Sequence, residues 1–579
     1  MRYLSLLCLL LSAGFLSSQT NFVFTDSTIP SILRGNYDAS IYAQTNVIDD
    51  PAVIFEGIAD QVSPTNLREY IQVLEGFGTR HTSSDTLSAT RGMGATRNWV
   101  LSMYDEFSAE NENRLIPFFF QFDQIVCTDM DRHKNACAIL PGTNPDANGI
   151  VIVEAHMDSR CEGRCDVECP SPGADDNASG TALVIELARI MSQYSYEHTI
   201  LFMATTGEEQ GLIGANAFAT YCSMEGIDIK AVFNNDIVGG ITCGKTSSPP
   251  SCPFEGAIDS TQVRMFSSGN ISKQFVRWIK LQYTEEMLPM VSVPMMLTIM
   301  GPLDRSGRGG DHIPFHERGF HAMRFTSANE NGDANVTDPA YCDHQHTSSD
   351  ILGMDTDGDG IQDSLFVDFN YLARNTQING TGIASAATGP ETPQFNFEID
   401  GDSIRWSVQD PLNLRHYRIA SRVSGNDFDT IMTFQDTTSG IFRRQFSTIF
   451  QDEIISGAGV DADGVESFFG TESFFITVLT STDDVEAAPK GFELFQNVKN
   501  PYYKSTLIQY NLGDLTGIKE VAITVTNTSG QIVDRIPATR HLGINSFNYY
   551  PTESMVGNHF YSLEINGEFV STKQMVILK

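Results

Sequence analysis

The sequence is short of basic residues, has no cysteine beyond residue 342 and contains no long apolar run after its first residues. Lys plus Arg number 37 against 72 Asp plus Glu, which gives a net charge of -35. A chain this acidic repels nucleic acid and anionic membrane surfaces. No later segment approaches the roughly 18 apolar residues of a membrane span. We therefore expect no nucleic-acid partner and no transmembrane span, and the simplest reason for the acidity is solubility outside the cell.

The composition is also unlike that of a disordered protein. Hydrophobic residues make up 41% of the 579 positions and charged residues 19%. These shares are ordinary for folded globular domains. Because the chain is too long for one hydrophobic core, we expect several folded units along it.

The first residues follow a secretory signal pattern. Met1 and Arg2 make a short basic start, an apolar stretch follows, and small residues lead to Gln19. We expect residues 1–19 to be a signal peptide and residues 20–59 to be an N-terminal extension. The mature protein is then secreted or held at the outer-membrane surface.

Nine cysteines remain after the signal segment. They stand at positions 127, 137, 161, 165, 169, 222, 243, 252 and 342. In an exported protein this clustering predicts disulfide bonds within one domain, with one thiol left over. Cys127 with Cys137 would tie a hairpin, and Cys243 with Cys252 would tie a loop. The trio at 161, 165 and 169 offers a metal site as the alternative, which an oxidising compartment disfavours.

Helical and strand-like patterns alternate through the first large part of the chain. This favours an α/β fold with a mixed, mostly parallel sheet flanked by helices. Residues 64–75 have helical apolar spacing after Ser63, a suitable N-cap, and residues 181–191 predict the next helix. Buried strands are expected at 149–155, 198–204, 229–234 and 321–326.

The pattern changes near residue 380, where Gly, Ala, Thr and Pro dominate, and we interpret residues 379–393 as a linker. Alternating strands over 394–485, with turns at about ten-residue intervals, predict a β-sandwich. This region resembles a fibronectin type III module, with Trp406 and Tyr417 in the positions of its core aromatics.

Residues 493–579 predict a second β-sandwich domain. The order of its motifs, which ends in Lys573-Gln-Met-Val-Ile-Leu-Lys579, resembles the C-terminal sorting domain of the type IX secretion system. The resemblance implies that the type IX machinery is a partner. An ordinary sandwich or a carbohydrate-binding module is the alternative.

Histidines and carboxylates follow the expected strands, which is where ligands bind in open parallel sheets. The candidates are His156 and Asp158, Asp175 and Asp176, Glu208 and Glu209, Asp236, and His346. Two adjacent buried acids are costly unless a cation compensates one of them. Two metal ions held by His and carboxylate ligands activate water and stabilise an oxyanion. The pattern therefore predicts a metal-dependent hydrolytic site.

The ordered set H-x-D, D-N-A-S-G, G-E-E, N-D and H-T-x-x-D spans roughly residues 60–378. It resembles the co-catalytic zinc peptidase family M28, of the secreted bacterial aminopeptidase type. The resemblance implies the zinc exopeptidase fold and removal of N-terminal residues from peptides. It also implies one zinc on His156 and Asp236, a second on Glu209 and His346, and Asp176 bridging both.

By the same resemblance Glu208 is the catalytic base, which takes a proton from the bridging water and returns it to the leaving amine. Asp158 orients the imidazole of His156 from behind. The segment Gly309–Phe315 resembles a family segment that lines the substrate pocket. It adds His312, either as an aid to the oxyanion or as a packing residue.

An oxygen-rich segment predicts a calcium loop. Its candidate ligands are Asp355, Asp357, Asp359 and Asp363. Gly360 stands at position 6 of this spacing, but Phe366 stands at position 12, where an EF-hand has Glu. The loop is therefore more like a thrombospondin-type or dockerin-type repeat, and an acidic surface turn is the alternative.

Three other functions stay open at this point. A carboxypeptidase or a glutaminyl-peptide cyclotransferase would use the same family site, and the cyclase branch has a similar Asp-His-Ile-Pro-Phe segment but is associated with one zinc. A non-catalytic surface adhesin would use the sandwich module instead. Metals other than zinc also suit a His and carboxylate site.

Overall fold

A computed structural model describes residues 20–579 with gaps. The gaps are 243–256, 306–308, 329, 331–343, 360–361, 363, 401–402, 410–413, 423–426, 436, 444–449, 479–491, 498–499, 501, 503–504, 514, 529, 553–554 and 579. The predicted signal peptide, Cys243, Cys252, Cys342 and Asp363 therefore lie outside the described residues.

The N-terminal part is built on a nine-stranded mixed sheet with the order β1-β2-β3-β5-β4-β6-β9-β7-β8. Its strands are β1 (Thr20–Phe24), β2 (Ile116–Val126), β3 (Asp129–Leu140), β4 (Ile150–His156), β5 (Ile200–Thr205), β6 (Ile229–Asn235), β7 (Gln262–Phe266), β8 (Met296–Ile299) and β9 (Ala322–Ser327). Strands β5, β4, β6 and β9 form a parallel centre, with antiparallel pairings on either side of it. The mixed sheet predicted from the strand patterns is confirmed.

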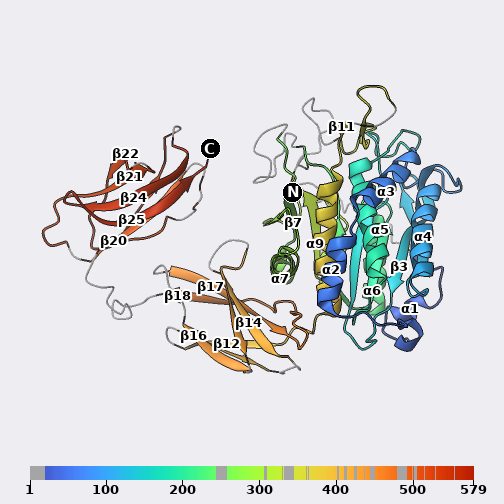
Figure 1. The fold of residues 1–579 in the computed structure, drawn as a ribbon, viewed down its shortest axis with the longest axis horizontal. Coiled ribbons are helices and arrows are strands. Elements are labelled where there is room, and N and C mark those ends of the chain that lie inside the picture. The colour runs from blue at the N-terminus through green and yellow to red at the C-terminus, as the bar shows by residue number, and fades with distance from the viewer. Residues whose placement is uncertain are drawn as a thin grey trace, which may run out of the picture. The chain divides into compact units, whose positions relative to one another are not determined.

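Helices cover both faces of this sheet (Figure 1). They are α1 (Ile29–Ile32), η1 (Ala39–Tyr42), α2 (Pro51–Gln61), α3 (Pro64–Gly76), α4 (Gly92–Glu110), η2 (Ala174–Ser179), α5 (Gly180–Met191), α6 (Ile213–Glu225), α7 (Gly269–Gln282), η3 (Tyr283–Met287), α8 (His312–Glu317) and α9 (Phe369–Thr388). Within the described ranges, no helix combines the length and the apolar character needed to cross a bilayer.

Strand β4 shows why the central strands are apolar along their whole length. Val151 and Val153 join the hydrophobic cluster that contains α5 and α9, whereas Ile150 and Ile152 join the cluster that contains α6. Successive side chains of a strand point to opposite faces, so a strand covered on both faces needs apolar residues at every position.

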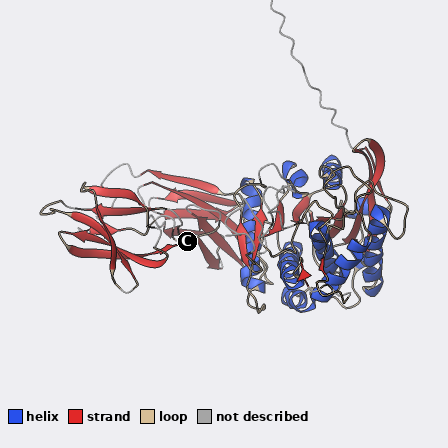
Figure 2. Cartoon of the chain, turned by 90° about the horizontal axis from the view of Figure 1, so that it is seen from above, coloured by secondary structure: helices blue, strands red, loops and turns tan. Residues whose placement is uncertain are grey.

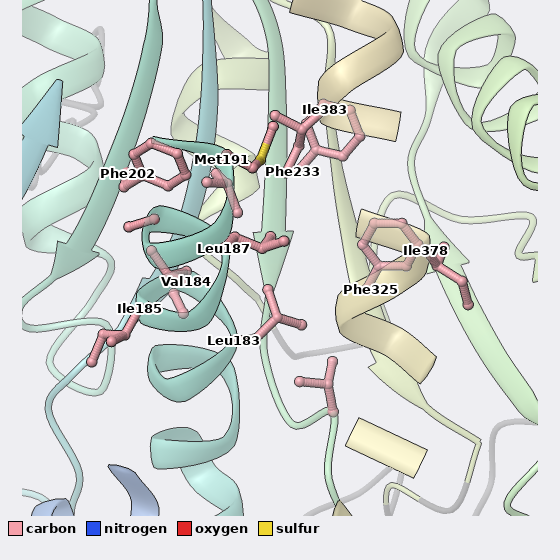
Figure 3. Packing of buried hydrophobic residues seen from close by; sticks show 14 of the residues in the cluster. Leu183, Val184, Ile185, Leu187, Met191, Phe202, Phe233, Phe325, Ile378 and Ile383 are labelled. Atoms are coloured by element: carbon pink, nitrogen blue, oxygen red, sulfur yellow. The ribbon is translucent and has the colours of Figure 1, made fainter. Parts of the chain in front are cut away.

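The largest cluster holds the carboxyl ends of the central strands in place. Figure 3 shows Leu187 and Met191 of α5 facing Phe233 of β6 and Ile383 of α9. Each such side chain, buried completely, stabilises the fold by about 2 kcal/mol. The strands that carry the candidate residues are therefore anchored in the largest hydrophobic cluster of the described residues.

Two local predictions have different outcomes. Helix α3 begins after Ser63, whose hydroxyl accepts a hydrogen bond from Asn66 N at 3.2 Å, as expected for an N-cap. The linker predicted for 379–393 is wrong for its first two thirds, because α9 continues through these residues to Thr388. Gly380 permits close packing there, since a Cβ would stand 2.8 Å from Ile58 Cγ2. Small residues here serve helix packing rather than flexibility.

The strand pairs whose register is described after α9 are antiparallel, and Figure 2 shows strands without helices there. One region has the sheets β12-β13-β16 and β15-β14-β17-β18, and the next has β19-β20-β23 and β22-β21-β24-β25. The strands are β12 (Phe395–Asp400), β13 (Ser403–Val408), β14 (His416–Arg422), β15 (Thr430–Gln435), β16 (Ser439–Arg443), β17 (Phe450–Val460), β18 (Ser473–Val478), β19 (Phe492–Leu494), β20 (Thr506–Leu512), β21 (Val521–Asn527), β22 (Ile532–Pro537), β23 (Gly543–Tyr549), β24 (Gly557–Ile565) and β25 (Glu568–Ile577).

Each β region encloses its own core. Trp406 and Tyr417 are buried in the first, with ring centroids 5.9 Å apart. Tyr510 and Tyr561 are buried in the second. By its internal contacts the chain separates into two compact units, and the second consists of 447–451 and 477–579. Sandwiches of two sheets are thus present, while the fibronectin and sorting-domain assignments stay predictions.

The disulfide bonds differ from the pairs that spacing suggested. Cys127 pairs with Cys165, and Cys161 pairs with Cys169. The hairpin bond between Cys127 and Cys137 is wrong, because Cys127 lies at the tip of the β2–β3 hairpin whereas Cys137 pairs with Phe118 far along the strand. The trio at 161, 165 and 169 is consumed by disulfides, so it offers no thiolates to a metal. Residues 160–169 instead form a loop held by two disulfide bonds, one within the loop and one to Cys127. We call it the stapled loop.

Candidate functional site

Five of the predicted residues meet at the carboxyl ends of the parallel strands. His156 ends β4, Asp236 follows β6, Asp176 lies in η2, Glu209 lies in the turn after β5, and His346 lies in the loop after the gap at 331–343. Two groups of three have ligand atoms within 4.8 Å of one another, and both groups contain Asp176. The sequence therefore named residues that the fold does bring together.

The carboxylate of Asp176 is divided between the two histidines. Its Oδ1 lies 3.3 Å from His156 Nε2, and its Oδ2 lies 3.2 Å from His346 Nε2. Asp236 Oδ1 is 3.4 Å from His156 Nε2, and Glu209 Oε2 is 3.3 Å from His346 Nε2. We call His156 with Asp236 the strand half and Glu209 with His346 the loop half, with Asp176 shared by both.

The geometry also separates Asp176 from Asp175. The Asp175 carboxylate accepts hydrogen bonds from the backbone amides of Gly239 and Gly240, at 3.0 and 3.1 Å. Asp350, the last residue of the H-T-x-x-D motif, accepts from the amides of both aspartates at 3.0 Å. Asp175 is therefore a structural acid, and Asp350 holds the turn that aims Asp176 into the site.

Asn177 connects the turn of Asp176 to the end of β6. Its side chain donates to Asn235 O at 2.8 Å and accepts from Ile237 N at 3.3 Å. Ile237 has a φ of 59°, an uncommon conformation for a β-branched residue. Backbone held in such a conformation needs support from its surroundings, which Asn177 provides on both sides of Asp236. In the sequence, this asparagine stands out only as part of the D-N-A-S-G motif.

Asp158 acts mainly on the turn that carries the two glutamates. Its carboxylate accepts from the amides of Gly207, Glu208 and Glu209 at 2.7, 3.3 and 3.3 Å. The predicted contact with the imidazole runs through the backbone instead. The Asp158 carbonyl lies 3.0 Å from His156 Nδ1, whereas the carboxylate is 3.7 Å away. A proton donated from Nδ1 to this carbonyl leaves Nε2 directed at the site.

Burial and mutual contacts shift the pKa values of the site. Burial raises the pKa of Glu208 well above its usual range, and the carboxylates of Asp236 and Glu209 raise it further. Burial would lower the pKa of His156, but hydrogen bonds to Asp176 and Asp236 raise it well above its usual value. Closely packed buried acids of this kind call for cations, and carboxylate oxygens with imidazole nitrogens are the donors that zinc prefers.

Two arginines also contact the site, and neither was among the residues predicted from the sequence. Arg160 donates from Nε to Glu209 Oε2 at 2.8 Å, and its Nη2 lies 2.6 Å from His346 Nδ1. Arg324 contacts Asp236 Oδ2 through Nη2 at 3.1 Å. Arg160 directly follows the His-Met-Asp-Ser motif, which was a usable signal, whereas Arg324 lies inside an apolar strand and had none.

His312 lies in α8 and is fully buried. Its Nε2 is 3.0 Å from the carbonyl of Leu303, and burial lowers the pKa of His312 to about 4. A neutral ring that donates from Nε2 presents only an acceptor at Nδ1. This suits a packing role better than donation to an oxyanion, and the catalytic role stays a prediction.

The predicted calcium loop lies between β10 (Gly353–Met354) and β11 (Ser364–Leu365). Oxygens of Asp355, Asp357 and Asp359 lie within 4.8 Å of one another, and all three residues are exposed. Asp363, the fourth candidate, is outside the described residues. Exposed acids of this kind also occur without an ion, so calcium stays a prediction.

Comparison with known proteins gives a consistent family. Residues 135–364 match peptidase family M28. A probable zinc metalloprotease of Leptosphaeria maculans is 30% identical over 391 residues, which cover 64% of this chain and 86% of that protein. One from Pyrenophora teres f. teres is 30% identical over 387 residues, which cover 63% of this chain and 76% of that protein. The solved LapA aminopeptidase of Legionella pneumophila is 17% identical with a TM-score of 0.42, over 58% of this chain and 74% of that chain.

Proposed function

Since the chain belongs to peptidase family M28 and is therefore a zinc peptidase, we propose that it is a secreted exopeptidase that removes N-terminal residues from peptides. It would use two zinc ions per chain and Glu208 as the general base. One zinc would be held by His156 and Asp236 and the other by Glu209 and His346.

The divided carboxylate of Asp176 carries the two-zinc proposal. A carboxylate whose two oxygens face two different imidazoles has the arrangement needed to bridge two metal ions. Each half then adds one histidine and one acid, which is an ordinary donor set for zinc. A single-metal site would leave one buried histidine and one buried acid without a cation to share.

Zinc bound in this donor set would supply an activated water and polarise a peptide carbonyl. We assign the proton transfer to Glu208, because it adjoins a ligand, is held by Asp158 through its own amide, and has a raised pKa. A base with a raised pKa holds a proton more readily, so it can both accept one from water and return it to the leaving amine.

Replacing Glu208 by Gln tests the assignment of the base. We expect Glu208→Gln to keep two equivalents of zinc and to lose roughly 100 to 10,000-fold in kcat. Hydrolysis of aminoacyl-p-nitroanilides and metal analysis measure the two quantities. Glu56→Gln on the exposed face of α2 is the matched control and should change neither. Full turnover in Glu208→Gln would remove Glu208 from the mechanism.

A separate set of peptides tests which end of the substrate the enzyme acts on. An aminopeptidase cleaves peptides with a free N-terminus and leaves N-blocked peptides intact. Cleavage of N-blocked peptides from the other end would identify a carboxypeptidase. Ring closure of glutamine-initiated peptides without hydrolysis would identify a glutaminyl cyclase. Wild-type protein with bound zinc but no activity on any of these peptides would favour the adhesin hypothesis.

The remaining proposals rest on sequence patterns. We propose export through the signal peptide, with residues 493–579 as a type IX sorting domain. A mature N-terminus near residue 20 and removal of the C-terminal domain, both read by mass spectrometry, would support this. For calcium, the clustered Asp355, Asp357 and Asp359 support a site. Titration calorimetry that shows the same Ca²⁺ response in wild type and Asp357→Ala would refute it.

A further inference from the structure

A buried charge network lies directly behind the strand half of the site. Arg324 on β9 is 1% exposed, and Glu330, which follows the same strand, is 0% exposed. Arg324 contacts Glu330 Oε1 through Nη2 at 3.2 Å and Asp304 Oδ2 through Nη1 at 3.1 Å. Arg264 contacts Glu330 Oε2 at 3.3 Å, and Arg305 pairs with both acids. Such a network is expensive to bury unless its charges meet one another closely.

Arg324 connects this network to the site through Asp236. Its Nη2 lies 3.1 Å from Asp236 Oδ2 and 3.3 Å from the Asp236 carbonyl oxygen. Asp236 Oδ1 is the oxygen that faces His156. The arginine therefore occupies one oxygen of the carboxylate and leaves the other one for the site.

The position of Arg324 is set by the sheet itself. Arg324 pairs with Asn234 in the parallel register of β6 and β9, two residues before Asp236. Its planar guanidinium reaches Asp236 with one nitrogen while the other is held by Asp304 and by the carbonyl of Gly309. A fork of donors fixed at both ends holds a carboxylate in one orientation, which a lysine ammonium cannot do.

The loop half has a different cation. The Arg160 side chain is 19% exposed and contacts Glu209 from the stapled loop 160–169. The strand half is thus backed by a buried arginine anchored in the sheet, whereas the loop half is backed by a partly exposed arginine.

We propose that Arg324 is a positioning residue that makes Asp236 a one-oxygen ligand, so that it controls the zinc of the strand half and leaves the zinc of the loop half unaffected. This inference rests on the proposed two-zinc function. Partners that orient metal ligands typically change metal affinity by about 10–100-fold when they are removed. Because the two halves share only Asp176, the loss is confined to one of two zinc equivalents.

The test measures zinc affinity by chelator competition in the full chain. We expect Arg324→Met to weaken one of the two equivalents by about 10–100-fold, and Arg324→Lys to recover part of that loss. Arg264→Lys is the matched control, since it alters the same network at Glu330 and Ser327, and should leave both affinities unchanged. Equal weakening of both equivalents in Arg324→Met, or of neither, would overturn the inference.

Double variants assign the effect to one half. In a His346→Ala background the remaining zinc sits in the strand half, and Arg324→Met should weaken it. In a His156→Ala background the remaining zinc sits in the loop half, and Arg324→Met should have no effect. The opposite pattern would overturn the inference. If Arg324→Met does not fold, Asp304→Asn, which weakens the hold on Nη1 of Arg324, replaces it and should weaken the same equivalent.

A result that refutes the proposed function differs from one that refutes only the role of Arg324. Wild-type protein that binds fewer than two zinc ions would refute the two-zinc mechanism whatever Arg324 does. In that case an unchanged affinity for the single zinc in Arg324→Lys and Arg324→Met would refute the positioning role as well.

Discussion

The strand half and the loop half of the site use the same ligand chemistry on different supports. His156 has a side-chain exposure of 1%, and its partner Asp236 is held by an arginine that is itself buried. His346 has a side-chain exposure of 10%, lies in a loop with a φ of 61°, and is backed by the partly exposed Arg160. The sheet thus supports one half through buried contacts, and loops support the other half through partly exposed ones.

The largest effect should come from the residue that both halves share. We expect Asp176→Asn to lose both zinc ions and to reduce kcat/KM by a factor on the order of a thousand or more, as when one member of a catalytic unit is removed. Metal analysis and peptidase assays check this. Asp175→Asn is the control, because that carboxylate serves backbone amides, and it should keep both zinc ions. If Asp176→Asn retains two zinc ions, Asp176 is not a ligand that both halves share.

A smaller effect is expected at Asp158, which serves both halves indirectly. Asp158→Asn weakens three hydrogen bonds from the Gly207–Glu209 turn, because a neutral amide oxygen is a poorer acceptor than a carboxylate. We expect a loss of about 10–100-fold in kcat with zinc retained. Thr82→Val, which removes one neutral contact to the same carboxylate, should cost far less. An unchanged kcat in Asp158→Asn would show that the Gly207–Glu209 turn keeps its conformation without the Asp158 carboxylate.

The smallest effect should be confined to the loop half. Burial raises the pKa of Glu209 while His346 and Arg160 lower it, so Arg160→Met should raise this pKa further. Glu209 must lose its proton to bind metal, so zinc uptake by this half should require a higher pH than in wild type. Near neutral pH we expect the loop half of Arg160→Met to bind zinc about fivefold more weakly, which is the effect of losing a partly exposed ion pair. Zinc titrations between pH 5 and 8, roughly the range where histidine ligands also titrate, measure it.

The matched control for Arg160 lies in the same stapled loop. Arg164 donates to the Glu209 carbonyl oxygen at 3.0 Å rather than to its carboxylate. Arg164→Met should therefore leave the pH dependence of zinc uptake unchanged. If Arg160→Met shifts the pH dependence of zinc uptake in both halves, the two halves are electrostatically coupled.

Most of the ligand set could be predicted because each motif is local. His156, Asp236 and the Gly207–Glu209 turn all follow strands whose apolar runs are visible in the sequence, and parallel strands end at the same edge of a sheet. The linker prediction failed because local composition was its only basis. Gly and Ala in α9 look like flexible chain, but they are needed where the helix packs closely on its neighbours.

Contacts between distant segments could not be predicted. Cys127 bonds Cys165 because the hairpin tip and the loop meet in space, whereas spacing favoured Cys137. The hydrogen bond from the Glu208 amide to Asp158 joins residues 50 positions apart along the chain. Arg324 has no motif at all, and its importance appears only when its strand lies beside β6.

By itself, the sequence determined which residues can bind metal, since the chemistry of imidazoles and carboxylates and their order along the strands are local properties. Only the tertiary structure decided how these ligands are divided and supported. It placed the two oxygens of Asp176 toward different histidines, gave one half a buried arginine and left the other half beside a partly exposed one. The physical reason is that orientation and burial depend on contacts between chain segments that only folding brings together.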